Sequence, residues 1–170
     1  MDMSTVAAVR EEDYLTTAYE PDCEFEDGVL IERNIGEQDH SWLQAALAAY
    51  FFRRRSAWKI EVYTEQRHCV RPGKYMLPDV CVVSQPRPSE KVFSHPPLIW
   101  VEILSPEDKP IKVNDKIRQL LEFGVPNIWV IDPETFEAEV HTPSGSRKVE
   151  DGVLRAEGTA IEVPLKGLEE

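Results

Sequence analysis

Residues 98–131 read LIWVEILSPEDKPIKVNDKIRQLLEFGVPNIWVI, and this stretch decides the fold. Residues 98–104 are apolar on both faces of a strand, which is typical of a central strand. Residues 112–123 predict an amphipathic helix that ends at Gly124, and residues 128–131 predict a second central strand. The helical segment is long enough for a right-handed crossover between parallel strands. The stretch therefore predicts an α/β fold.

The flanking sequence adds strands on both sides of this unit. Upstream we expect a helical segment, a hairpin with its turn at Asp27-Gly28, a long helix, and an antiparallel pair of strands around a turn at 71–74. These lie at residues 10–22, 25–35, 38–54, 59–70 and 75–83. Residues 84–97 carry four prolines and predict a long loop. Downstream we expect a strand at 137–141 and a small β tail with two further turns.

Two of the apolar strands each contain one carboxylate. Asp79 follows Pro78 at the start of one strand, and Glu102 lies in the middle of another. Ionised carboxylates are seldom buried unless they are paired or hold a metal. If the two strands are neighbours in register, both side chains lie on one face and repel each other unless a cation sits between them. The alternative is that Asp79 caps a turn and Glu102 pairs with a basic residue.

Lys116 completes a set suited to metal-dependent phosphodiester hydrolysis. It lies on the helix that follows the Glu102 strand, and a helix packed on the sheet can bring its ammonium group back to the carboxylates. There it can orient the attacking water or neutralise developing charge. Otherwise it is a solvated lysine paired with Asp115 or Glu122.

Glu32 and His40 are secondary candidates. Glu32 closes the apolar run at 29–31 and is placed to add a metal contact or hold a water molecule. His40 opens the long helix and is placed for acid–base chemistry or a phosphate contact. The structural alternatives are a surface strand end and a helix-start residue.

The charge is acidic and unevenly distributed. The net charge of −12 argues against a protein that coats nucleic acid non-specifically. Residues 1–32 contain ten acidic residues and one arginine, whereas residues 53–74 contain seven basic residues and two acidic ones. The basic segment includes Arg53, Arg54 and Arg55. It predicts either a local basic face or a solvated helix end.

The size and composition favour a single domain spanning residues 1–170, with a core at about 25–145 and a β tail at 146–170. No apolar run approaches the length of a membrane span, and residues 1–12 show no signal-peptide pattern. Three cysteines without a CxxC pair favour a reducing compartment. We therefore expect a cytoplasmic protein without a membrane partner.

Several segments together resemble a known family. They are GVLIE at 28–32, His40, Thr64-Glu65, PDV at 78–80, VEILSP at 101–106, Asp115-Lys116 and GVPNIWVIDP at 124–133. In this order they resemble the bacterial "putative restriction endonuclease" family, abundant in cyanobacteria, of the PD-(D/E)XK nuclease superfamily. The resemblance covers about residues 12–145.

The resemblance implies a restriction-endonuclease-like α/β core, in which helices flank a mixed β-sheet and extra β-hairpins lie at both ends of the chain. It also implies Mg²⁺, for which Mn²⁺ can substitute, and DNA as substrate. Asp79 and Glu102 would then be metal ligands, Lys116 the catalytic lysine moved onto the helix, and Glu32 an additional acidic position. Leu120 stands where the family often has a tyrosine.

Our hypothesis from the sequence is a Mg²⁺-dependent DNA endonuclease. We expect a homodimer, because two cuts in a duplex suit two-fold symmetry. Phosphate contacts are expected from Arg53, Arg54 and Arg55, or from Lys109 and Lys112. The first alternative is a catalytically inactive module that keeps the nuclease fold for binding. A weaker alternative is an acidic mimic of DNA.

Overall fold

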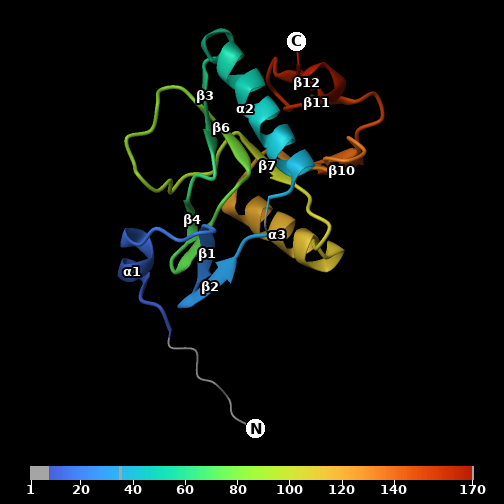
Figure 1. Ribbon diagram of the computed structural model, residues 1–170. Coiled ribbons are helices and arrows are strands. Elements are labelled where there is room, and N and C mark those ends of the chain that lie inside the picture. The colour runs from blue at the N-terminus through green and yellow to red at the C-terminus, as the bar shows by residue number, and fades with distance from the viewer. Residues whose placement is uncertain (1–7, 35, 170) are drawn as a thin grey trace.

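The computed structural model describes residues 8–34 and 36–169 (Figure 1). Residues 1–7, part of the segment in which we predict no signal peptide, lie outside this range. The main sheet has six strands in the order β10-β9-β8-β7-β6-β3. Their bounds are β3 (Ile60–Thr64), β6 (Val80–Ser84), β7 (Ile99–Ile103), β8 (Ile128–Ile131), β9 (Ala138–Thr142) and β10 (Gly145–Lys148).

The strand–helix–strand unit is central, as predicted. β7 pairs in parallel with β8, while the other neighbouring strands of this sheet are antiparallel. The connecting helix α3 (Pro110–Phe123) ends at Gly124, whose φ of 105° lies in the left-handed region that glycine adopts without strain. The sheet is therefore mixed, and the predicted fold class is confirmed.

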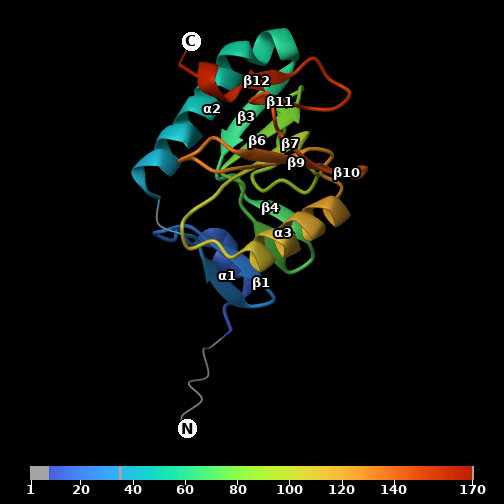
Figure 2. The same cartoon turned by 90° about the vertical axis from the view of Figure 1, so that its right-hand side faces the viewer.

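The two long helices cover opposite faces of this sheet (Figures 1 and 2). Helix α2 (Gln38–Trp58) packs Leu43, Leu47, Tyr50 and Phe51 against alternate strand residues such as Val101. The intervening strand residues face α3 and form a second cluster. Its buried members are Met76, Trp100, Ile117, Leu120, Val125, Ile128 and Val130. Both faces are buried, which is why these strands are almost continuously apolar.

A second sheet, in the order β2-β1-β5-β4, lies beside the first. It contains β1 (Cys23–Glu26), β2 (Val29–Glu32), β4 (His68–Arg71) and β5 (Lys74–Met76), and α1 (Glu11–Thr16) packs on it through Tyr14.

The predicted strands at 59–70 and 75–83 were therefore wrong as single elements. Glu65, with a positive φ of 51°, separates β3 from β4, and Pro78 lies between β5 and β6 without an amide hydrogen. The antiparallel pair thus passes from one sheet to the other.

The C-terminal segment continues the main core. It forms β11 (Val153–Arg155), β12 (Glu162–Pro164) and the short 3-10 helix η1 (Leu165–Gly167). Leu154, Val163, Leu165 and Leu168 are buried in the α2-side cluster. The hairpin β1–β2 and the C-terminal β pairs are the extra hairpins that we predicted at the two ends.

The helices differ from prediction in detail. α1 is shorter than the predicted segment, and α2 extends to Trp58, so only Arg55 of the three arginines lies in its last turn. Trp42 on α2 is 42% exposed. Over the described parts of the chain, no helix has the length and apolar character needed to cross a membrane.

Candidate active site

Asp79 and Glu102 lie side by side where the main sheet faces the second sheet. Val80 pairs with Val101, and the Asp79 amide donates a hydrogen bond to the Val101 carbonyl at 3.1 Å. The antiparallel register therefore places Asp79 opposite Glu102, so the two side chains are cross-strand neighbours. Their side chains are only 3% and 16% exposed. The two strands are thus neighbours in register, which is the condition under which we expected both carboxylates to lie on one face of the sheet.

Both carboxylate oxygens of Asp79 contact cationic groups or hydrogen-bond donors of the protein. Oδ1 lies 2.6 Å from Arg33 Nη2 and 3.4 Å from His40 Nε2, and Oδ2 accepts the Ile103 amide at 2.7 Å. Burial alone would raise the pKa of Asp79, but the His40 contact and the Arg33 charge bring this pKa below its usual value. Asp79 is therefore ionised, and the pKa of His40 is raised in return, above all by its contact with Asp79.

Lys116 bridges Glu102 and Glu24. Its Nζ lies 2.9 Å from an oxygen of each carboxylate. Glu102 also accepts the indole N–H of Trp100 at 2.6 Å, and Glu24 accepts the Leu77 amide at 2.9 Å. Burial would lower the pKa of Lys116, but the charges of Glu102 and Glu24 raise it above its usual value. Lys116 is therefore a charged donor and not a base at neutral pH.

The fixed charges do not balance. The carboxylates of Asp79, Glu102 and Glu24 face two fixed cations, Arg33 and Lys116, and the titratable His40, while Glu65 at the mouth is half exposed. Burial raises the pKa of Glu102; Lys116 opposes this rise, and the nearby carboxylates add to it. With His40 neutral, the site has one excess negative charge that an additional cation would relieve.

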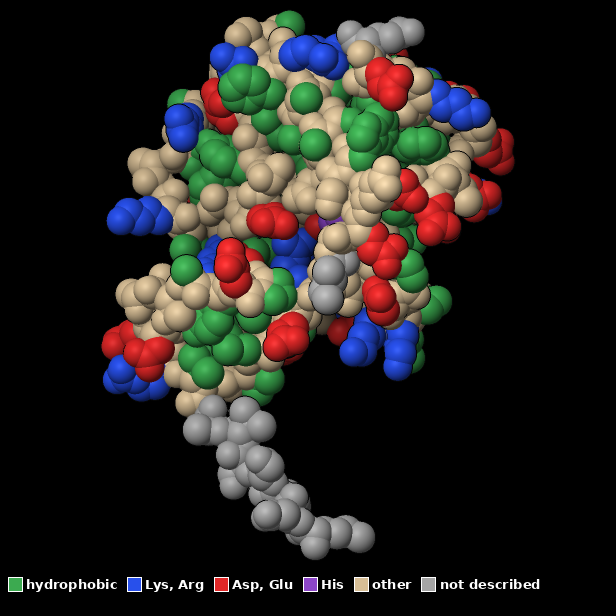
Figure 3. All heavy atoms as spheres, viewed as in Figure 1, with side chains coloured by type: hydrophobic (Ala, Val, Ile, Leu, Met, Phe, Trp, Pro, Cys, Tyr) green, Lys and Arg blue, Asp and Glu red, His purple; other side chains and the backbone are tan. Residues whose placement is uncertain are grey.

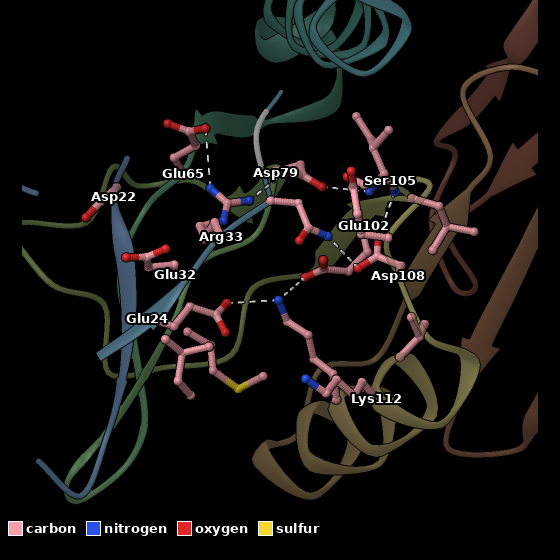
Figure 4. Close-up of a pocket in the computed structure, with 18 of the residues that line it drawn as sticks. Asp22, Glu24, Glu32, Arg33, Glu65, Asp79, Glu102, Ser105, Asp108 and Lys112 are labelled. Atoms are coloured by element: carbon pink, nitrogen blue, oxygen red, sulfur yellow. Dashed lines mark hydrogen bonds and ion pairs between the residues drawn. The ribbon is translucent and has the colours of Figure 1, made fainter. Parts of the chain in front are cut away.

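These residues line a cavity of about 990 Å³ between the two sheets. Figure 3 shows the hollow, with basic side chains inside it and acidic side chains around its edge. In Figure 4, Glu24 and Glu32 lie across the cavity from Asp79 and Glu102, Arg33 reaches over to contact Asp79, and Lys112 lies on α3 below. Lys109 and Glu107 also line it.

The structure brings together most of the predicted residues. Asp79 contacts His40, Glu102 contacts Lys116, and these four residues line the same cavity as Glu32, Lys109 and Lys112. Asp115 and Glu122, the alternative partners of Lys116, pair instead with Arg118.

The three arginines of α2 lie apart from this network. Arg53 donates to the Leu168 carbonyl, Arg54 lies over the Tyr50 ring, and Arg55 lies over the Phe52 ring. At 1.5 Å per residue, Arg54 is about 20 Å along the helix from His40. None of the three lines the cavity.

Sequence reasoning missed Glu24 and Arg33. Glu24 belongs to an acidic N-terminal segment that reads as solvated, although its alternation with the buried Cys23 and Phe25 places it on the opposite face of β1. Arg33 follows the last residue of β2. The available signal for Glu24 was its place on an alternating strand. That strand presents a carboxylate, and the next strand in the sequence is also acidic. Local sequence offered none for Arg33.

The donor chemistry fits a divalent cation. Among residues 8–34 and 36–169, no three His, Cys, Asp or Glu side chains form a metal-binding group. Mg²⁺, however, is commonly held by one or two carboxylates together with water and substrate phosphate. Asp79 and Glu102 provide two hard oxygen ligands in a site with surplus negative charge.

The chain matches the family Uma2, described as "Putative restriction endonuclease", over residues 11–169. It therefore belongs to this family, which confirms the resemblance seen in the sequence. Among solved structures it is similar to one described as a "putative nuclease belonging to DUF820" from Anabaena variabilis. The TM-score is 0.77 at 22% identity, over 92% of this chain and 95% of that chain, and this likeness shows the fold. No curated protein matches.

Proposed function

We propose that this member of the Uma2 family is a Mg²⁺-dependent DNA endonuclease in which Mn²⁺ can replace Mg²⁺. The observation that carries the proposal is the buried pair Asp79–Glu102 with Lys116 at the floor of the cavity. With His40 neutral, this cluster keeps one excess negative charge next to an open cavity. Family membership supports the nuclease assignment.

Asp79 and Glu102 would hold the cation, which would polarise the scissile phosphate and activate a water molecule. Lys116 then acts through its charge. Two of its three N–H donors point to Glu24 and Glu102, which leaves one for a water molecule or a phosphate oxygen. Because Lys116 is protonated, it orients and neutralises, and it does not abstract a proton.

The remaining candidates have supporting roles in this proposal. His40, held against Asp79, orients that carboxylate, and Glu32 adds an acidic group on the opposite wall. Lys109 and Lys112 line the cavity at the start of α3 and are our candidates for phosphate contacts. We retain the homodimer as a proposal, since a symmetric pair of sites suits cleavage of both strands.

The test is cleavage of plasmid DNA in Mg²⁺ and in Mn²⁺ by wild type, Asp79→Asn and Lys116→Met. We expect losses of at least about a hundredfold in both variants, because each removes a group placed at the reacting phosphate. Arg118→Met is the matched control, since it removes a cation from the same helix that pairs with exposed carboxylates and does not line the cavity, and it should cleave at close to the wild-type rate. Folding is checked by circular dichroism. Wild-type cleavage rates in folded Asp79→Asn would refute the proposal.

A non-catalytic binding module is the alternative, and one observation favours it. Both oxygens of Asp79 are already engaged by groups of the protein itself. In that case Arg33 would permanently take the place of a metal beside Asp79. Wild type would then show neither cleavage nor metal binding, whereas the endonuclease proposal predicts both.

A further inference from the structure

Arg33 approaches Asp79 from the cavity side. It lies on the connection between β2 and α2, outside both elements, and its Nη2 is 2.6 Å from Asp79 Oδ1. Its Nη1 lies 3.3 Å from Glu65 Oε1. Figure 4 shows the guanidinium between these two carboxylates, above Glu24 and Glu32. The Arg33 side chain is 17% exposed, so it forms part of the cavity wall.

The position of Arg33 differs from that of Lys116. Lys116 reaches the carboxylates from α3 and pairs with Glu24 and Glu102. Arg33 pairs with Asp79, one of the two proposed metal ligands. Arg33 and His40 both approach Asp79 Oδ1, at 2.6 and 3.4 Å. A cation bound to Asp79 would therefore meet a fixed positive charge in a poorly screened site.

We propose that Arg33 is an internal counter-ion that holds Asp79 when no metal is bound and is displaced when a divalent cation binds. The inference rests on the proposed function and adds a form of regulation to the same site. The excess negative charge favours entry of a cation, and Arg33 sets the concentration at which this occurs.

A displaced Arg33 has an alternative partner within reach. Glu65 is 50% exposed and already contacts Nη1. Rotation of the guanidinium towards Glu65 would move it to the cavity mouth, where its planar donors suit a phosphate oxygen pair. A substrate phosphate would then help to draw Arg33 away from Asp79, so that metal and DNA favour each other's binding.

The test is the affinity for Mn²⁺ by titration calorimetry, without DNA. Arg33→Gln should bind Mn²⁺ at least about tenfold more tightly than wild type, because a competing positive charge has been removed. Lys112→Gln is the control: it removes a positive charge from the same cavity but not from Asp79, and should stay within about threefold of wild type. Equal Mn²⁺ affinity in wild type and Arg33→Gln would overturn the inference and leave the proposed function intact.

A second measurement does not depend on the folding of a variant. Crystal structures of wild type with and without Mn²⁺ should show the Arg33–Asp79 contact only in the metal-free form. Retention of this contact beside bound Mn²⁺ would also overturn the inference. Failure of both wild type and Arg33→Gln to bind Mn²⁺ would instead refute the metal site and, with it, the proposed function.

Discussion

His68 is fully buried on β4, with its ring against Phe93 and Trp100 at centroid distances of 5.3 and 4.9 Å. Its Nδ1 lies 2.8 Å from the Gln66 carbonyl, which can only accept, so Nδ1 carries the proton. Within the described residues Nε2 has no hydrogen-bond partner. Burial lowers the pKa of His68 to about 4 from an ordinary value of 6.5.

This histidine predicts a loss of stability in acid. Between pH 6.5 and 4 the unfolded chain binds the His68 proton and the folded chain does not, so the contribution is complete above pH 6.5 and falls as the pH is lowered. Between pH 7.5 and pH 5, wild type should lose about 2 kcal/mol more unfolding free energy than His68→Phe. Urea unfolding at the two pH values measures the difference.

His95→Gln is the control for this measurement, because the His95 side chain is 85% exposed. It should show the pH dependence of wild type. If His68→Phe lost as much stability as wild type between the two pH values, the assignment of a neutral buried His68 would be wrong.

Site residues could be predicted from the sequence where they interrupt the apolar pattern of a strand. Asp79 and Glu102 stand out because they interrupt apolar strands, and they lie together with side chains 3% and 16% exposed. Arg33 and Glu24 violate no local pattern, and only the approach of two sheets gives them their partners. The arginines at 53–55 formed a clear basic cluster in sequence but lie elsewhere on α2.

At the scale of elements, Lys116 ties α3 to β1 and β7 through two poorly exposed carboxylates. Arg118, two residues later, also contacts two carboxylates, Asp115 and Glu122, but all three side chains are at least half exposed. The same helix therefore offers a buried and an exposed ion-pair cluster of similar composition.

Lys116→Met should destabilise the fold by roughly 3 kcal/mol, because it leaves Glu24 and Glu102 buried without their cation. Arg118→Met should cost much less than Lys116→Met, since solvent screens its partners. Both values come from urea unfolding at neutral pH. Equal losses in the two variants would contradict the buried network described for Lys116.

Element boundaries were predictable where one signal dominated. Gly124 marked the end of α3, and the continuous apolar runs marked β7 and β8. The separation of β3 from β4, and of β5 from β6, was not predictable, because alternation along a strand does not indicate which sheet the strand joins. The site depends on this separation, since it places the second sheet opposite Asp79.

At the scale of the whole molecule, acidic residues are found both in the N-terminal segment and around the cavity. Glu24, Glu26 and Glu32 from β1 and β2 line the cavity, so part of the acidic segment at residues 1–32 forms the wall of the candidate site. The C-terminal segment shares the α2-side core, which supports our proposal that the chain is one domain with a core longer than the 25–145 range that we expected.

The central claim is that Asp79 and Glu102 bind a divalent cation, and thermal melting in the presence of Mn²⁺ tests it most directly. At a hundredfold excess over its dissociation constant, Mn²⁺ should stabilise wild type by about 2.7 kcal/mol, or roughly 5–10 °C in Tm. Glu102→Gln should show no shift, while Glu139→Gln, an exposed carboxylate on β9, should respond as wild type does. The account is contradicted if wild type shows no Mn²⁺-dependent shift, or if Glu102→Gln shows the same shift as wild type.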